Sequence, residues 1–184
     1  GKYMIFWMED AWPAAKLMYS KIDADGNVEI GWNPNGNSLS NSSFDSRNLE
    51  LRKINDESGI LAIWIQDGNF SDIYAQKIDW DGNILWNDQG VPITTDDNDQ
   101  VNISFDLNQS QTKTLITWED YKNGVDFNIF GKVIDLSTGD VLGELIEFTD
   151  DTTSQYNPTV KSIQDDEFII IWEDERGYYN EDPL

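Results

Sequence analysis

Residues 115–120 read LITWED, and a closely related stretch recurs three more times along the chain. The other copies are MIFWMED at residues 4–10, LAIWIQD at residues 61–67 and IIIWED at residues 169–174. Each copy is an apolar run that ends in a tryptophan followed by acidic or amide residues. The four tryptophans, Trp7, Trp64, Trp118 and Trp172, stand 57, 54 and 54 residues apart. Such a regular spacing indicates a repeat architecture.

A second marker follows the first three tryptophan runs at nearly the same period. It reads LMYSKID at residues 17–23, DIYAQKID at residues 72–79 and NIFGKVID at residues 128–135, with closing aspartates 56 residues apart both times. The tryptophan run is continuously apolar, which predicts a strand buried on both faces, whereas the second marker alternates and predicts a half-buried strand. Asp-Gly and Gly-Asn pairs around Gly26 and Gly82 predict tight hairpin turns after it.

Two further strands complete each predicted unit. The outgoing strand is expected at residues 28–32 and 84–86, with Leu39 and Ile93 beyond them. A short strand precedes each of the later tryptophan runs, near residues 48–54, 101–107 and 158–163. Along the whole chain this pattern predicts thirteen strands, divided three, four, four and two among successive units, and no helix.

Four-stranded units repeated at this length are the signature of a β-propeller. We therefore expect an all-β chain that forms a partial β-propeller of about three to three and a half blades. Residues 1–184 would form a single propeller segment, with units at residues 1–47, 48–100, 101–156 and, incompletely, 157–184. The alternatives are other repeated all-β arrays, namely a β-solenoid, whose rungs are usually shorter, or tandem sandwiches, whose units are usually longer.

Composition and charge exclude several classes of function. The chain has 12 basic and 35 acidic residues, for a formal net charge of −23. A nucleic-acid partner is excluded, because no basic cluster exists to contact phosphates, and binding to anionic membranes is disfavoured for the same reason. The absence of histidine and cysteine removes Ser-His-Asp triads, thiolate nucleophiles, His or Cys metal sites and disulfides. No apolar run is long enough to span a bilayer, so we expect no membrane insertion.

The combination of IIIWED, DIYAQKID, DGNILWN and GVPI resembles a repeat of large secreted bacterial surface proteins. Such proteins are common in Bacteroidota and related lineages, where many are exported by the type IX pathway. The resemblance covers essentially the whole chain and implies an extracellular or cell-surface location. The chain departs from the repeat at residues 11–13, which read AWP, and at residues 137–140, which read STGD.

The acidic residues that follow the tryptophans have two interpretations. Asp10, Asp67, Asp120 and Asp174 recur in every unit, which favours a structural role in capping the loop after the strand and pairing with Lys122 or Arg176. Alternatively, carboxylates from two blades could flank a glycosidic bond as an acid–base pair. Adjacent residues of one strand point to opposite faces, so a Glu-Asp neighbour pair cannot do so by itself.

Three further features bear on binding. Asp-x-Asp-Gly-Asn at residues 23–27 and 79–83 resembles the opening of a calcium loop, but it lacks the distal acid, so we expect hairpin turns, no metal site and at most loosely held calcium. Trp32 and Trp86 occupy equivalent positions, which favours packing. Trp12 and Trp80 have no counterparts and are the predicted ligand contacts, with a glycan as the expected class.

The sequence thus supports two hypotheses of function. The first is a non-enzymatic extracellular or cell-surface propeller segment that acts in adhesion, assembly or ligand binding. The second is a fragment of a propeller glycoside hydrolase that uses Asp and Glu chemistry. Because propellers close with about four to eight blades, we expect the open blades to be covered by the remainder of a longer chain, by another protein or by a second copy.

Overall fold

The computed structural model describes residues 1–10, 12–55, 58–122 and 124–176, so the end of the last predicted unit, residues 177–184, lies outside the described residues. Within these ranges the chain forms thirteen strands and no helix, and hence no helix that could cross a membrane. The strands form antiparallel sheets of three, four, four and two strands. Both the predicted strand count and the predicted all-β class are confirmed.

The chain divides into two compact units, and unit 1 comprises residues 1–69 and 73–92. Its sheet A has the order β1-β2-β3 and its sheet B the order β4-β5-β6-β7. The strands of sheet A are β1 (Lys2–Glu9), β2 (Lys16–Asp23) and β3 (Asn37–Ser38). Those of sheet B are β4 (Asp45–Ile54), β5 (Gly59–Asp67), β6 (Ser71–Ile78) and β7 (Val91–Pro92).

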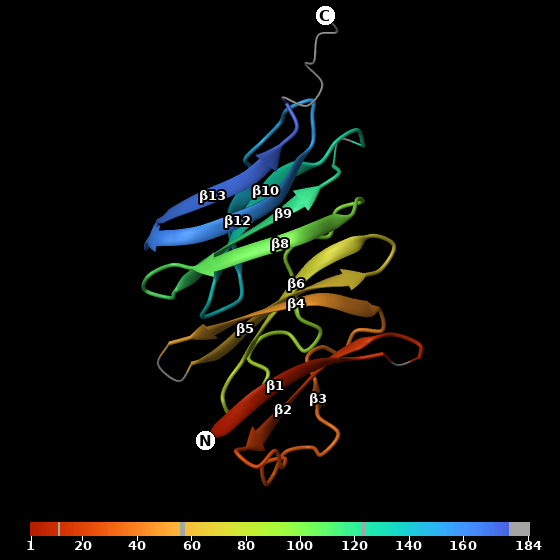
Figure 1. Cartoon of the computed structure of the whole chain (residues 1–184), viewed down its shortest axis with the longest axis vertical. Coiled ribbons are helices and arrows are strands. Elements are labelled where there is room, and N and C mark those ends of the chain that lie inside the picture. Colours follow the sequence, from red (N-terminus) through yellow and green to blue (C-terminus); the bar gives the residue numbers. More distant parts are fainter. Residues whose placement is uncertain (11, 56–57, 123, 177–184) are drawn as a thin grey trace, which may run out of the picture. The chain divides into compact units, whose positions relative to one another are not determined.

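Unit 2 comprises residues 70–72 and 93–184. Its sheet C has the order β11-β10-β9-β8, and its sheet D pairs β12 with β13 (Figure 1). The strands of sheet C are β8 (Gln100–Leu107), β9 (Lys113–Asp120), β10 (Asn128–Asp135) and β11 (Val141–Glu147). Those of sheet D are β12 (Gln155–Gln164) and β13 (Glu167–Asp174).

In each unit, two consecutive sheets pack face to face with the same polarity. We call the face of a sheet that carries its repeat tryptophan the tryptophan face, and the other the opposite face. In unit 1, Trp64 on the tryptophan face of sheet B packs in one buried cluster with Leu17 and Tyr19 on the opposite face of sheet A. In unit 2, β12 lies against β8 and β9, where the amide N–H of Val160 donates to Ser104 Oγ at 3.1 Å. This stacking of four-stranded repeats is that of consecutive blades, and the partial β-propeller is confirmed.

The prediction of the outgoing strand is wrong in detail for the first two repeats. Instead of strands at residues 28–32 and 84–86, single bridges join Val28 to Ile22 and Ile84 to Ile78, and the paired strands are the two-residue β3 and β7. In sheet B the side chain of Gln76 replaces the ladder, since its Oε1 accepts from the amide N–H of Trp86 at 3.1 Å and its Nε2 donates to the carbonyl of Asn87 at 2.5 Å. Buried polar backbone groups need such partners, so the chain can leave the sheet here.

The strand that precedes the tryptophan strand, which we call the inner strand, carries a bulge at the same place in sheets B, C and D. The register shifts within β4, β8 and β12, and Asn48, Asn102 and Asn157 there have φ of 52°, 51° and 53°. Asparagine is among the few residues that adopt this left-handed conformation readily. The sequence therefore encodes one bulge per repeat, and the bulge bends the strand near its first residues.

Candidate functional site

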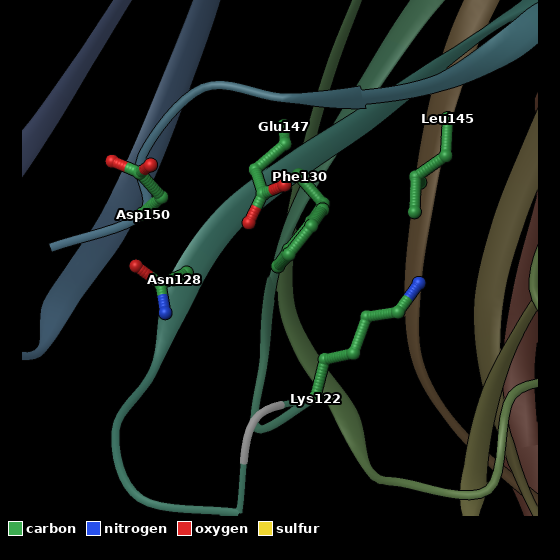
Figure 2. Close-up of a pocket in the computed structure, with 6 residues that line it drawn as sticks. All are labelled: Lys122, Asn128, Phe130, Leu145, Glu147 and Asp150. Atoms are coloured by element: carbon green, nitrogen blue, oxygen red, sulfur yellow. The ribbon is translucent and has the colours of Figure 1, made fainter.

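A pocket of about 340 Å³ opens on sheet C (Figure 2). Its lining combines a cation, an amide, two carboxylates and two apolar side chains, contributed by β10, β11 and the segments that flank them. The lining residues are Lys122, Asn128, Phe130, Leu145, Glu147 and Asp150. Glu147 and Asp150 are exposed, whereas Asn128 and Phe130 are buried. A buried apolar floor under a polar rim is the usual composition of a small-molecule site.

Hydrogen bonds fix the amide of Asn128 at the pocket. Its Nδ2 donates to Asp126 Oδ1 at 3.0 Å, and its Oδ1 accepts from Thr149 Oγ1 at 3.3 Å. The same threonine oxygen accepts from the amide N–H of Ile129 at 2.8 Å, which ties the segment after β11 to β10. The amide is thus held in one orientation before any ligand arrives.

Lys122 supplies the positive charge of the pocket. Its Nζ lies 3.6 Å from Asp96 Oδ2 and 5.7 Å from the centre of the Phe130 ring. The ion pair is half-exposed, so its contribution to stability is small. The position of Lys122 matters more, because it places a hydrogen-bond donor beside the Phe130 ring.

A second group of acidic residues surrounds the segment between β7 and β8. Burial, together with the negative charges of Asp96 and Asp99, raises the pKa of Asp72 to about 6, while a hydrogen bond with Thr94 opposes the shift. Asp72 Oδ1 is buried and has no hydrogen-bond partner. Asp99 Oδ1 accepts from the amide N–H of Ser71 at 2.8 Å. Asp72 therefore changes its charge near neutral pH, as general acids do.

Asp120, at the end of β9, is a second perturbed carboxyl group. It has no exposed surface, and burial raises its pKa, with Asp96 adding to the shift and Lys122 opposing it. Its Oδ2 accepts from Trp118 Nε1 at 3.4 Å, and its Oδ1 has no hydrogen-bond partner. Perturbed carboxyls of this kind are enriched in functional sites, although ion-pair networks also produce them.

The recurring acids do not all play one role. Asp174 Oδ2 pairs with the Arg176 guanidinium at 2.8 Å, as the loop-capping interpretation expected, and hydrogen bonds from Arg176 lower the pKa of Asp174. Lys122, in contrast, has its ion pair with Asp96. Asp67 Oδ2 pairs with Arg47 Nε at 2.7 Å. Asp10 is exposed.

The four aspartates also differ in their spacing from the tryptophan. Asp120 and Asp174 follow their tryptophan by two residues, whereas Asp10 and Asp67 follow theirs by three. One residue along a strand reverses the face, so Asp67 is not equivalent to Asp120. Gln66, which is buried at the end of β5, occupies the corresponding position in sheet B. The buried carboxyl of Asp120 is thus less repetitive than the sequence pattern indicated.

The predicted hairpin turns are present. Asp79 Oδ1 accepts from the amide N–H groups of Asp81 and Asn83 at 2.9 Å each, and Asp23 Oδ1 accepts equivalent bonds in the first repeat. Gly26 and Gly82 have φ of 87° and 86°, and a Cβ at Gly82 would collide with the ring of Trp32. These carboxylates serve their own turns, and no group of three or more acidic side chains in the described ranges is arranged to hold a metal ion.

The two predicted ligand tryptophans lie at opposite ends of their sheets. Trp12 is 92% exposed in the loop between β1 and β2. Trp80 lies in the turn after β6, where its carbonyl accepts from Lys21 Nζ at 2.6 Å near the far end of β2. An eight-residue strand spans roughly 26 Å, so the two rings do not form one site. Among the repeat tryptophans, Trp64 and Trp118 are fully buried, while Trp7 and Trp172 are partly exposed.

The sequence analysis missed the pocket and the buried carboxyls, although the sequence contains a signal for them. Thr94 and Gln100 are six residues apart, as are Thr149 and Gln155. Side chains of these pairs form hydrogen bonds in the segments before β8 and β12. Gln100 Oε1 accepts from Thr94 Oγ1 at 2.8 Å, and Gln155 Nε2 donates to the carbonyl of Thr153. In the second marker of the repeat, Asp72 stands at the position that Asn128 occupies in the next copy. That substitution within the repeat marks Asp72 as distinctive.

Comparisons with solved structures find distant similarity. The chain is similar to an endo-arabinase from Bacteroides thetaiotaomicron, with 14% identity, a TM-score of 0.47 and coverage of 94% of this chain and 66% of that one. It is also similar to a thermostable family-43 glycoside hydrolase, with 15% identity, a TM-score of 0.43 and coverage of 92% of this chain and 65% of that one. The chain thus spans just under two thirds of the length of these enzymes. No protein-family model and no curated protein sequence matches it.

Proposed function

We propose that this chain is a non-enzymatic segment of an extracellular or cell-surface β-propeller protein that binds a neutral glycan at the sheet C pocket. The pocket itself carries this proposal. Lys122 and Asn128 offer donors, Glu147 and Asp150 offer acceptors, and Phe130 and Leu145 form an apolar floor. A sugar presents both hydroxyls and apolar C–H faces, so it matches this lining. Anionic ligands are disfavoured by the two carboxylates and by the net charge of −23.

Calorimetric titration with a panel of neutral and acidic oligosaccharides tests the proposal. We expect a neutral glycan to bind the wild type and to lose at least tenfold in affinity with Glu147→Gln or Asp150→Asn, because each variant removes a charged acceptor. Asp166→Asn, at a side chain that is 82% exposed and lies outside the pocket, is the matched control. If Trp12→Ala abolishes binding and the pocket variants retain it, the pocket is not the site.

A specific observation favours a second candidate function, glycoside hydrolysis. Asp72, with a pKa of about 6, can carry a proton near neutral pH, and buried Asp120 also has a raised pKa. Glycosidases use one carboxyl that donates a proton and another that stays ionised. Asp96, which pairs with Lys122, is a neighbouring carboxylate whose charge acts on both Asp72 and Asp120.

Reducing-sugar release from a polysaccharide panel distinguishes the two functions. The binding proposal predicts no release above background for the wild type. Release that is abolished by Asp72→Asn or Asp120→Asn, but not by Asp166→Asn, would establish hydrolysis instead. Because the three variants make the same chemical change, their comparison separates loss of an acid–base group from loss of charge.

A further inference from the structure

Lys122 belongs to two groups of side chains in unit 2. It lines the sheet C pocket together with Asn128 and Phe130. Its Nζ also lies 3.6 Å from Oδ2 of Asp96, which is in the segment before β8 and outside the pocket lining. The lysine therefore connects the proposed glycan site with the acidic residues beside it.

Four carboxyl groups, Asp72, Asp96, Asp99 and Asp120, form what we call the acidic cluster. They come from the start of β6, the segment before β8 and the end of β9. The charge of Asp96 acts on both Asp72 and Asp120, and that of Asp99 acts on Asp72. The Oδ1 atoms of Asp72 and Asp120 are buried and have no hydrogen-bond partner. Ionising such a carboxyl is costly, so the cluster favours binding of a proton.

The other side chains that face Asp120 carry less charge than Lys122. Gln100 and Asn128 stand directly opposite Asp120 on β8 and β10, and both are neutral amides. The Nζ of Lys132 donates to the carbonyl of Ile93 at 2.8 Å, at the start of the segment before β8. Lys122 is the cation whose charge opposes the raised pKa of Asp120. Its position therefore bears on the protonation of the cluster.

The next repeat holds its equivalent acids differently. There Arg176 pairs with Asp174 at 2.8 Å and with Asp151 at 3.2 Å, so one guanidinium neutralises two carboxylates. Lys122, at the place of Arg176, reaches Asp96 but leaves Asp120 Oδ1 without a partner. The acidic cluster thus has more negative charge than its single lysine balances, and it holds that lysine by one long ion pair.

We propose that the sheet C pocket and the acidic cluster compete for Lys122, so that glycan binding and proton uptake by the cluster favour each other. This inference rests on the proposed glycan site and adds a regulation to it. A sugar oxygen that accepts from Lys122 Nζ weakens the ion pair with Asp96, whose charge then raises the pKa of Asp72 further. Because coupling is reciprocal, a protonated cluster holds Lys122 less tightly and leaves it available to the ligand.

The direction of the pH effect follows from this coupling. The pKa of Asp72 is about 6, so the cluster gains a proton as the pH falls from 8 to 5. We expect glycan affinity to rise by about fivefold over that range, at the lower end of the usual coupling between two sites. Protonation of Glu147 or Asp150, the acceptors on the pocket rim, would weaken binding instead, so the two causes have opposite signs.

Calorimetric titration with cellotetraose, xylotetraose and mannotetraose at pH 5, 6, 7 and 8 tests the inference. The wild type should bind more tightly at pH 5 and take up protons on binding near pH 6, measured in buffers of different ionisation enthalpy. Asp72→Asn should lose this pH dependence, because the residue can no longer ionise. Asp166→Asn makes the same chemical change at a side chain that is 82% exposed and outside the cluster, and it should keep the wild-type dependence.

The outcomes separate this inference from the proposed function. Absence of binding at every pH would overturn both. Binding that is equally tight at pH 5 and pH 8, that weakens toward pH 5, or that keeps its pH dependence in Asp72→Asn would overturn the inference alone. A ligand-free measurement adds a second arm: the pKa of Asp72, read by NMR from its carboxyl carbon, should rise in Lys122→Met. An unchanged pKa would show that the lysine and the cluster are not coupled, and would also overturn the inference.

Discussion

Strands β9 and β13 carry nearly the same sequence in opposite environments. In β9, Trp118, Glu119 and Asp120 are all buried, whereas in β13 Trp172 is partly exposed and Glu173 and Asp174 are exposed. The motif determines that each segment is a strand and which side chain points to which face. For Glu119 and Glu173 the neighbouring sheets decide burial, because sheet D covers the opposite face of sheet C while the opposite face of sheet D stays open. Trp172 and Asp174 lie on the other face, and there the difference is within the sheet: β9 lies between β8 and β10, whereas among the described strands β13 pairs with β12 alone.

The two environments also shift the pKa of the repeated aspartate in opposite directions. Burial raises the pKa of Asp120, whereas hydrogen bonds and the charge of Arg176 lower the pKa of Asp174. The basic residue two positions further is Lys122 in one copy and Arg176 in the other. Arg176 bridges Asp174 and Asp151, while Lys122 reaches Asp96 and leaves Asp120 Oδ1 without a hydrogen-bond partner. The same motif therefore gives a buried carboxyl with a raised pKa in sheet C and an exposed carboxylate with a lowered pKa in sheet D.

The largest expected effect is on stability when the two tryptophans are truncated. Trp118→Ala should lower the free energy of unfolding by about 3–5 kcal/mol, because it removes a large, fully buried side chain. Trp172→Ala should cost well under half as much, since that side chain is already partly exposed. Urea denaturation of both variants measures the difference. Equal costs would show that the two strands have equivalent environments.

The next effect concerns the glutamates beside these tryptophans. Glu119 Oε1 accepts from Asn102 Nδ2 at 2.7 Å and from the amide N–H of Asn157 at 2.6 Å. Glu119→Ala leaves both donors without this acceptor and should cost about 1–3 kcal/mol. Glu173→Ala, at an exposed position, should change stability by less than about 0.5 kcal/mol. If the Glu173 variant proves as destabilised as the Glu119 variant, Glu173 does not lie on an open face.

Sequence alone predicted the repeat, the strands and the hairpin turns, because these depend on local patterns such as Asp79-x-Asp81-Gly82-Asn83. It misjudged the outgoing strand, since the buried side chain of Gln76 takes over backbone hydrogen bonds in a way that no local pattern shows. It also missed the pocket, whose residues come from separate segments of sheet C. The equivalence of Asp67 and Asp120 failed because one residue of offset reverses the face of a strand.

A smaller effect is the pH dependence of stability at the two aspartates. The pKa of Asp120 is raised on folding, so the native state binds more protons and stability falls as pH rises from the unfolded pKa to the folded one. Asp120→Asn should flatten that fall and stabilise the protein at neutral pH. The pKa of Asp174 is lowered, so its stabilisation is present above the unfolded pKa and is lost as pH falls through the folded pKa. Asp174→Asn should therefore destabilise at neutral pH.

Urea midpoints of the two variants, measured from pH 3 to pH 8, give both signs in one experiment. The account requires opposite changes at neutral pH and differences from the wild type that shrink toward the acidic end, as protonation removes the charge of each carboxyl. Variants that shift in the same direction at neutral pH would contradict the assignment of different environments to the two residues.

The central claim is that sheet D exposes the face that the same repeat buries in sheet C. Amide hydrogen exchange of the dilute wild-type chain tests it most directly, because protection reports local opening strand by strand. The account predicts slow exchange throughout β9 and much faster exchange in β13. Equal protection of β9 and β13 in the dilute monomer would contradict it.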